Sequence, residues 1–144
     1  MASAPVYLDY AATTPIDRRV AERMQRVQST TWFNPTSNHI AGRQSAAVVD
    51  QAAAELAGLL NVRPESIYWT SGATESNNLA IQGVARQRAH RGKHLVTMRT
   101  EHKAVVDVFR ALEQQGFEVT WLTSDPTGRT TAAAVDAAMR DDTQ

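Results

Sequence analysis

The 144-residue sequence contains no cysteine. Within these residues this excludes disulfides, thiolate metal sites and a catalytic thiol, and it is typical of a reducing compartment. The sequence also has no excess of positive or negative charge, because 15 Lys and Arg balance 15 Asp and Glu. The charge balance therefore does not favour binding to nucleic acid. No apolar run approaches the roughly 20 residues of a membrane helix, and no signal peptide is evident. We expect a cytoplasmic protein that binds neither nucleic acid nor a membrane.

The first 65 residues show two helical patterns separated by a loop. Thr14 is predicted as an N-cap, with Pro15 in the first helical position. Apolar side chains then recur at helical spacing, at Ile16, Val20, Met24 and Val27. Residues 29–42 are rich in small polar residues and predict a loop. A second helix is predicted over about residues 44–60, and residues 61–65 end it.

Beyond residue 66, strand and helix patterns alternate. Strands are predicted at 67–70, 94–98 and 117–122, and helices at 74–90, 101–115 and 131–140. This alternation favours an α/β fold with a parallel sheet and flanking helices. Three parallel strands form a thin sheet with open edges, and the sequence stops after a helix, where another strand is expected. The interpretations are an incomplete domain or a small α/β domain with a charged tail.

A short apolar stretch, a turn of small residues and a helix start follow one another around Gly72. The first amides of a helix have no intrahelical partner and lie at the positive end of its dipole. A strand that feeds such a turn therefore predicts an anion site, most often for phosphate, with donors near Ala73 and Thr74. Neither G-x-G-x-x-G nor the Walker motif is present. A plain strand-to-helix turn is the alternative.

Histidines are the next candidates. His102 follows the predicted strand 94–98 and opens a helix, at the strand end where α/β folds gather ligands. A helix N-terminus disfavours a charged imidazole, so a neutral ring would be free to stack on a ligand. A solvated histidine is the alternative. His39 is predicted in a loop, and His90 and His94 flank a basic turn and are expected to face solvent.

Four separated segments resemble the cysteine desulfurases, pyridoxal-phosphate enzymes of the fold-type I, class V aminotransferase superfamily. They occur in the family's order and are YLDYAATTP (7–15), NPTSNHIAGR (34–43), TSGATESNN (70–78) and TEH (100–102). The resemblance covers nearly the whole chain. It implies an incomplete fold-type I large domain over residues 15–144. Residues 1–14 would form an N-terminal arm or the start of the small domain.

The resemblance also implies roles for single residues. Ala73 and Thr74 would bind the phosphate of pyridoxal 5'-phosphate. His102 would stack on its pyridine ring, with a part in proton transfer. Six residues would lie near the substrate pocket or a dimer interface: Ala11, Ala12, Thr13, Asn34, His39 and Arg43. No metal is implied.

The family reaction removes sulfur from L-cysteine, leaves alanine and forms an enzyme persulfide. The resemblance therefore implies L-cysteine as substrate, a homodimer, and an iron–sulfur scaffold or another sulfur acceptor as partner. In this family the Schiff-base lysine and the thiol nucleophile lie further along the chain. Lys93 and Lys103 lack the family's Ser-x-His-Lys context, so we expect these 144 residues to be inactive alone.

Alternatives remain open at this point. The chain would also suit a selenocysteine lyase or another class V relative. It would equally suit a non-catalytic module that pairs with a desulfurase, or half of a split enzyme completed by a separate C-terminal chain. One departure from the family is the aromatic pair Trp32-Phe33 before Asn34, where a glycine usually stands.

Overall fold

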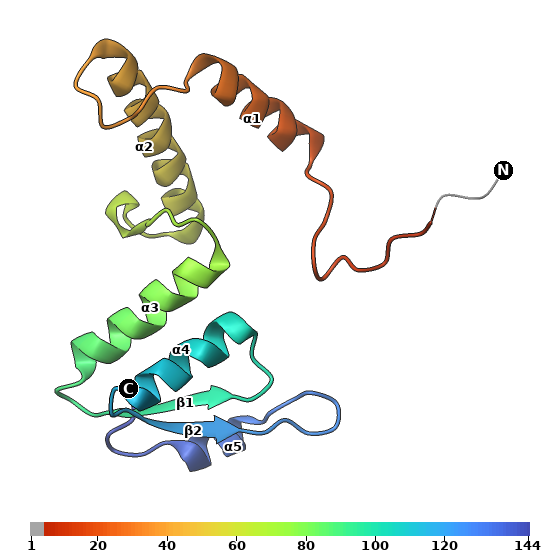
Figure 1. The fold of residues 1–144 in the computed structure, drawn as a ribbon, viewed down its shortest axis with the longest axis vertical. Helices are drawn as coiled ribbons and strands as arrows, with labels where there is room; N and C mark the ends of the chain where they lie inside the picture. Colours follow the sequence, from red (N-terminus) through yellow and green to blue (C-terminus); the bar gives the residue numbers. More distant parts are fainter. Residues whose placement is uncertain (1–4) are drawn as a thin grey trace. The chain divides into compact units, whose positions relative to one another are not determined.

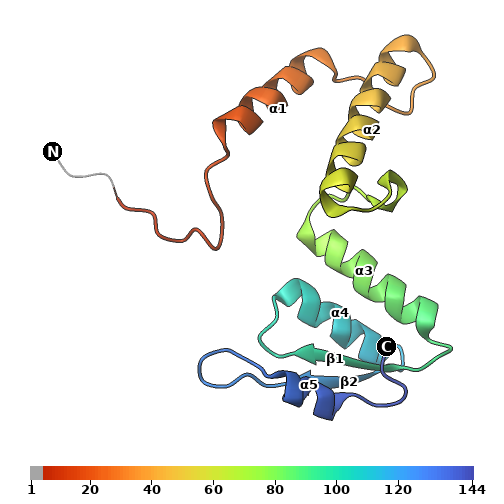
Figure 2. The ribbon, with the colours of Figure 1, turned by 180° about the vertical axis from the view of Figure 1, so that it is seen from behind.

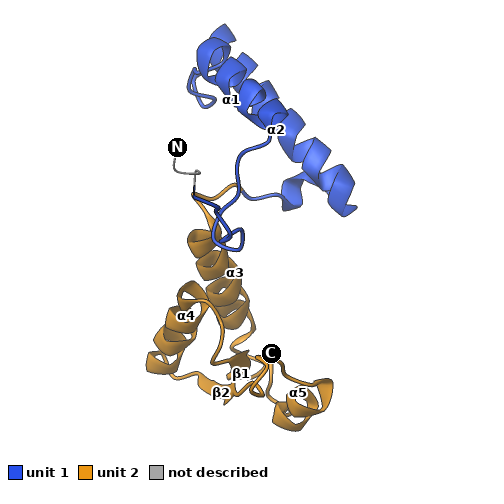
Figure 3. Ribbon diagram, turned by 90° about the vertical axis from the view of Figure 1, so that its right-hand side faces the viewer, with its two compact units in different colours: residues 1–68 blue, residues 69–144 orange. Residues whose placement is uncertain are grey.

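The computed structural model describes residues 5–144, which form two compact units divided between Tyr68 and Trp69 (Figures 1 and 3). Of the expected N-terminal arm, residues 1–14, the first four lie outside the described residues. The division into units falls well after that arm, and the arm itself stays a prediction.

In unit 1, helix α1 spans Arg18–Thr30 and its N-cap is Asp17. The prediction of Thr14 as the cap and Pro15 as the first helical residue is wrong. Asp17 Oδ1 accepts the Arg19 backbone N–H at 2.8 Å, and the Asp17 carboxylate also binds the Arg19 guanidinium at 3.0 and 2.9 Å. These contacts, the side-chain bonds foremost, lower the pKa of Asp17. An ionised carboxylate at the positive helix end is a stronger acceptor than a threonine hydroxyl.

Helix α2, Ile40–Leu60, begins four residues before the predicted start at residue 44. The imidazole of His39 is its N-cap, since Nδ1 accepts the Gly42 N–H at 3.1 Å. A Cβ on Gly42 would lie 2.2 Å from the Ser37 carbonyl oxygen, so glycine is required where the first turn meets the loop. The end at Leu60 is as predicted. The 3-10 turn η1, Pro64–Ser66, follows and packs on α2.

Unit 2 holds a parallel sheet of two strands, β1 (His94–Met98) and β2 (Glu118–Leu122), in register from His94↔Glu118 to Met98↔Leu122. These confirm the strands predicted at 94–98 and 117–122. The helices are α3 (Ala73–Arg88), α4 (Lys103–Gln114) and α5 (Ala132–Ala138). Helix α4 lies on one face of the sheet and α5 on the other (Figure 1; Figure 2 from behind). The parallel α/β prediction is therefore confirmed.

The core of unit 2 lies between the sheet and helices α3 and α4. It consists of Ala85, Leu95, Val108, Phe109, Leu112 and Phe117. Alternate strand residues face opposite sides of a sheet, so Leu95 points into this core while Val96 lines a hollow with Val135 of α5. Leu112 is fully buried. This core fixes α3 and α4 relative to the strands.

The predicted strand at 67–70 is wrong. A strand needs a ladder of backbone hydrogen bonds to a neighbour, and among residues 5–144 the sheet contains only β1 and β2. Tyr68 and Trp69 are exposed. The apolar stretch before Gly72 therefore runs as unpaired chain into α3.

His94 was expected to face solvent, and this is also wrong, because only 1% of its surface is exposed. Its Nδ1 lies 2.7 Å from Thr143 Oγ1 and its Nε2 lies 2.8 Å from Thr120 Oγ1. A buried ring needs partners for both nitrogens, and the two hydroxyls provide them. Thr143 also forms a parallel bridge with His94, so the last residues lie along the edge of β1 away from β2.

Helix α5 stops at Ala138 rather than at the predicted residue 140, because Met139 is extended. Arg140 then turns back to form ion pairs with Glu118, at 2.6 Å, and with Asp142, at 2.8 Å. Within residues 5–144, no helix is both long and apolar enough to cross a membrane.

Candidate functional site

The predicted anion cup lies at the start of α3. Its N-cap, Gly72, has φ 159° and ψ −179° and carries no side chain to cap the helix. The first helical bond runs from the Ser76 N–H to the Gly72 carbonyl, at 3.1 Å. Within residues 5–144, no acceptor pairs with the backbone N–H groups of Ala73 and Thr74, and both residues are exposed. Two aligned donors at the positive end of a helix are thus open to an anion.

A carboxylate holds the turn that leads into this cup. Glu75 Oε2 accepts hydrogen bonds from the Ser71 backbone N–H at 2.7 Å and from the Ser71 hydroxyl at 2.6 Å. These bonds, that to the hydroxyl foremost, lower the pKa of Glu75. This pair of Glu75–Ser71 hydrogen bonds, called the Glu75 clasp below, was not predicted from the sequence. A glutamate in the third helical position is the sequence feature that could have indicated it. In a capping box that residue reaches back to the start of the helix.

Hydroxyl contacts support the same turn. Thr70 Oγ1 donates to the Gly72 carbonyl at 3.2 Å and lies 2.7 Å from Ser76 Oγ. On the next turn of α3, Asn78 Nδ2 donates to the Thr74 carbonyl at 2.9 Å. These bonds use none of the Ala73 and Thr74 amides. The turn is therefore fixed by its own side chains, and the amides stay available.

The donor set fits the phosphate end of pyridoxal phosphate. A phosphate oxygen needs N–H or O–H donors. The Thr74 hydroxyl is a third donor beside the two amides, and it makes no hydrogen bond within residues 5–144. The nearby negative group, Glu75, is already engaged by Ser71. A Cβ built on Gly72 would meet nothing within 4 Å, so space is open in front of the turn. In the described residues, no three His, Cys, Asp or Glu side chains gather in a way that could hold a metal ion.

His102 begins the other helix of this unit. It is the N-cap of α4, and its Nδ1 accepts the Ala104 backbone N–H at 3.1 Å. An acceptor Nδ1 carries no proton, so the neutral ring has its proton on Nε2. The residue is exposed. The ring is therefore held by its helix with Nε2–H free to donate.

Helices α3 and α4 begin at the same end of unit 2, the end toward which both strand arrows point (Figures 1 and 2). Ala73 and Thr74 thus share an edge of the unit with His102. Carboxyl ends of parallel strands are where α/β folds place ligands. Three of the predicted site residues therefore lie at the starts of two helices that begin at the same end of unit 2.

The other six predicted residues belong to unit 1. Asn34 Oδ1 accepts from the N–H of Thr36 at 2.9 Å and from its hydroxyl at 2.8 Å, which fixes the loop before α2. His39 caps α2, as described above. An Arg43 guanidinium N–H donates to Asn38 Oδ1 at 3.4 Å. This loop is held by local bonds, and Arg43 is exposed.

Ala11 and Ala12 lie in a turn after Asp9, and Thr13 follows that turn. The Ala12 N–H donates to the Asp9 carbonyl at 3.1 Å, and the Tyr7 hydroxyl donates to the Asp9 and Thr13 carbonyls, at 2.8 and 3.3 Å. All three predicted residues are exposed. Their assignment to a pocket or interface stays a prediction.

This chain is similar to known proteins of one family. The class-V aminotransferase family model matches residues 6–144. Cysteine desulfurase IscS of Neisseria meningitidis (serogroup C / serotype 2a) is 53% identical over 140 residues, which cover 96% of this chain and 35% of the relative. The similar solved structures include the following two. "SspA in complex with cysteine" has a TM-score of 0.84 and 41% identity, and covers 95% of this chain and 40% of that one. A NifS-like protein has a TM-score of 0.87 and 33% identity, and the match covers 96% of this chain and 38% of that protein.

The chain thus spans about a third of the length of the curated relatives that it matches, 35% in the case of the Neisseria protein. The shared part is their N-terminal portion. It includes the α3 cup and His102. Since the family model matches almost every residue from Val6 onward, the chain belongs to the class-V aminotransferase family, as a cysteine-desulfurase-like N-terminal portion.

Proposed function

We propose that this chain is the phosphate-gripping portion of a pyridoxal-phosphate-dependent cysteine desulfurase, which takes sulfur from L-cysteine and leaves alanine. The observation that carries the proposal is the pair of free amides, Ala73 and Thr74, on a turn already fixed by Glu75. A prepared donor pair binds an anion without a further cost of ordering the loop.

Each residue of the cup has a defined task. The Ala73 and Thr74 N–H groups and the Thr74 hydroxyl donate to phosphate oxygens, and the α3 dipole adds to the attraction. His102, with Nδ1 fixed by Ala104, presents a neutral ring for stacking and the Nε2–H for donation. When bound, pyridoxal phosphate supplies the electron sink for the substrate chemistry.

The choice of L-cysteine over selenocysteine is supported by the named relatives. The Neisseria protein is a cysteine desulfurase, and the SspA structure contains cysteine by its title. The family resemblance supports a homodimer and an iron–sulfur scaffold or another sulfur acceptor as partner. We place Ala11, Ala12, Thr13, Asn34, His39 and Arg43 near the substrate pocket or dimer interface on the same ground. A cytoplasmic location fits the lack of cysteine.

The test removes one amide donor without disturbing the helix. Proline is favoured in the first helical position and has no N–H, so Ala73→Pro deletes a donor from the cup and leaves α3 in place. Ala132→Pro, in the first position of α5, is the matched control. Binding of pyridoxal phosphate to the 144-residue chain is followed by ³¹P NMR, with circular dichroism to confirm folding.

Loss of one charge-assisted hydrogen bond predicts an affinity for pyridoxal phosphate about tenfold weaker in Ala73→Pro. Ala132→Pro should bind as the parent chain does. Equal binding by all three proteins, or no binding by the parent chain, would contradict the proposal.

A further inference from the structure

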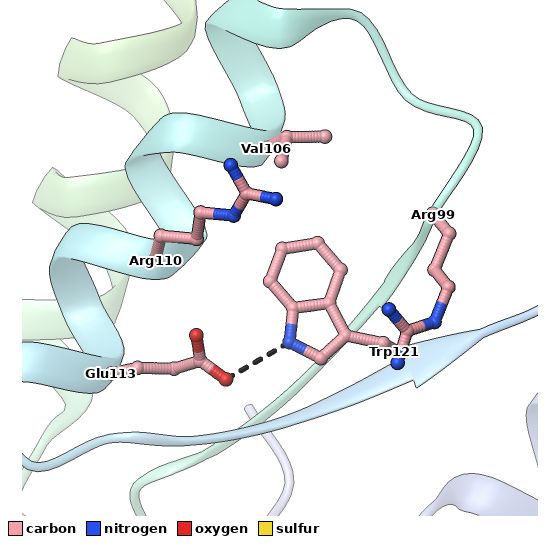
Figure 4. A pocket seen from close by; sticks show the side chains of 5 residues that line it. All are labelled: Arg99, Val106, Arg110, Glu113 and Trp121. Atoms are coloured by element: carbon pink, nitrogen blue, oxygen red, sulfur yellow. Dashed lines mark hydrogen bonds between the residues drawn. The ribbon is translucent and has the colours of Figure 1, made fainter.

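A cavity lies where α4 packs beside β2 and the segment after β1. It has a volume of about 200 Å³ and is lined by Arg99, Val106, Arg110, Glu113 and Trp121. Figure 4 shows Arg110 reaching from α4 and Arg99 from the segment after β1 toward the indole of Trp121 from different directions. None of these residues belongs to the proposed phosphate site.

The indole ring is held in place. Trp121 Nε1–H donates to Glu113 Oε1 at 2.9 Å, the bond drawn in Figure 4. On its core side the ring meets Phe109 edge-on, with centroids 6.2 Å apart at 66°. A ring fixed by its N–H and by an aromatic neighbour offers a flat apolar wall at little cost in side-chain entropy. It is half-buried, so part of that wall remains open.

The positive charges around this wall are only partly neutralised. Arg110 has an acidic neighbour only at 3.8 Å, Asp107, and the Arg99 guanidinium forms no hydrogen bond or ion pair within residues 5–144. Glu113 is the acidic residue of the lining, and the indole N–H occupies one of its oxygens. Two guanidinium groups therefore face one partly engaged carboxylate. Arginine pairs with planar carboxylates in bidentate fashion and also stacks on rings.

We infer that this cavity is a binding site for a small planar carboxylate, with the ring of the ligand against Trp121 and its carboxylate between Arg99 and Arg110. Its volume lies below the roughly 300–1,000 Å³ of pockets for drug-sized ligands, so the site suits a single ring. The Trp121–Glu113 bond aims the ligand's charge at the arginines, because the glutamate side of the indole repels an anion.

The test uses the indole N–H of Trp121 as the reporter in ¹H–¹⁵N NMR of the 144-residue chain, assigned by its loss in Trp121→Phe. The probe is benzoate, and benzamide is its neutral counterpart. Benzoate should shift the Trp121 signal in a saturable way that weakens with added salt, and benzamide should not. Arg99→Gln and Arg110→Gln should each weaken benzoate binding by about tenfold.

Two further variants sharpen the result. Arg91→Gln removes an exposed arginine outside the cavity and should leave binding unchanged. Glu113→Gln keeps an acceptor for the indole N–H but removes the opposing charge, and should tighten binding. No saturable shift at millimolar benzoate, an equal response to benzamide, or unchanged binding in both Arg99→Gln and Arg110→Gln would overturn the inference.

Discussion

Glu75 and Ser71 are joined by two hydrogen bonds to a single carboxylate oxygen, one from the backbone N–H and one from the hydroxyl. In the usual capping box the glutamate in the third helical position reaches the N–H of the capping residue. Here that residue is Gly72, and the carboxylate reaches one residue further back. The consequence is that the carboxylate orders the cup without occupying the Ala73 and Thr74 amides.

This clasp should depend on pH in one direction. The pKa of Glu75 is lowered from its ordinary value of 4.5 because the Ser71 bonds favour the ionised form. A lowered carboxyl pKa contributes stability that is present above the ordinary value and is lost as pH falls through the folded-state value. We predict that the Ser71 amide signal in ¹H–¹⁵N NMR titrates with a midpoint below 4.5.

The control for this titration is Glu75→Gln, in which the Ser71 amide should show no such step. The variant should also bind pyridoxal phosphate several-fold more weakly, because the turn is less ordered before binding. A midpoint at or above the ordinary glutamate value would contradict the clasp.

Leu112 tests the core that positions both helices. It is fully buried among α3, α4 and the strands, so Leu112→Ala should lower the free energy of unfolding by about 2–5 kcal/mol. Leu79, on α3, is 54% exposed, and Leu79→Ala should change it by less than about 0.5 kcal/mol. Urea unfolding followed by circular dichroism measures both. Equal effects would mean that Leu112 is not in the core.

Two glycines of α2 should respond in opposite ways to alanine. In Gly42→Ala the new methyl group would lie 2.2 Å from the Ser37 carbonyl oxygen, so the first turn of α2 must shift. Its amides should then exchange faster with solvent. Gly58 lies within the helix with nothing within 4 Å, and Gly58→Ala should stabilise it by about 0.5–1 kcal/mol. Hydrogen exchange of the α2 amides reports both effects. Faster amide exchange in Gly58→Ala than in the parent chain would contradict the position of Gly58 within α2.

The buried ring of His94 should be sensitive to its hydroxyl partners. Thr143→Val keeps the shape but leaves both His94 Nδ1 and the Arg140 backbone N–H unpaired, so we expect a loss of about 1–3 kcal/mol in the free energy of unfolding. Thr123→Val, at an exposed position of unit 2, is the control. Urea unfolding again gives the comparison. Equal stability of the two variants would show that the hydrogen bonds of the Thr143 hydroxyl do not contribute to the free energy of unfolding.

Sequence patterns predicted most of the bodies of the elements, because apolar spacing reports which face is buried. They failed at the starts of α1, α2 and α4, whereas α3 and α5 begin within one residue of their predicted starts. Asp17, His39 and His102 each cap a helix through a side chain whose reach depends on the folded turn. Imidazole is not among the common N-caps, so its role at α2 and α4 was not predicted from residue type.

Two further errors depended on distant parts of the chain. Residues 67–70 have strand-like composition, but pairing requires a partner that the pattern does not contain. His94 is buried because Thr143, 49 residues away, supplies a hydrogen bond. The start of α3 after small residues was predicted correctly, since it is a local property, and the anion cup at that start stays a prediction. The Glu75 clasp that orders it was not predicted.

The central claim is that the first backbone amides of α3 donate hydrogen bonds to the phosphate of pyridoxal phosphate. The most direct measurement is ¹H–¹⁵N NMR of the 144-residue chain titrated with pyridoxal phosphate and, separately, with pyridoxal. The account predicts that the Ala73 and Thr74 amide protons move downfield with the phosphate ester, and only slightly with pyridoxal. Unmoved amides at Ala73 and Thr74, with saturable shifts elsewhere, would contradict it.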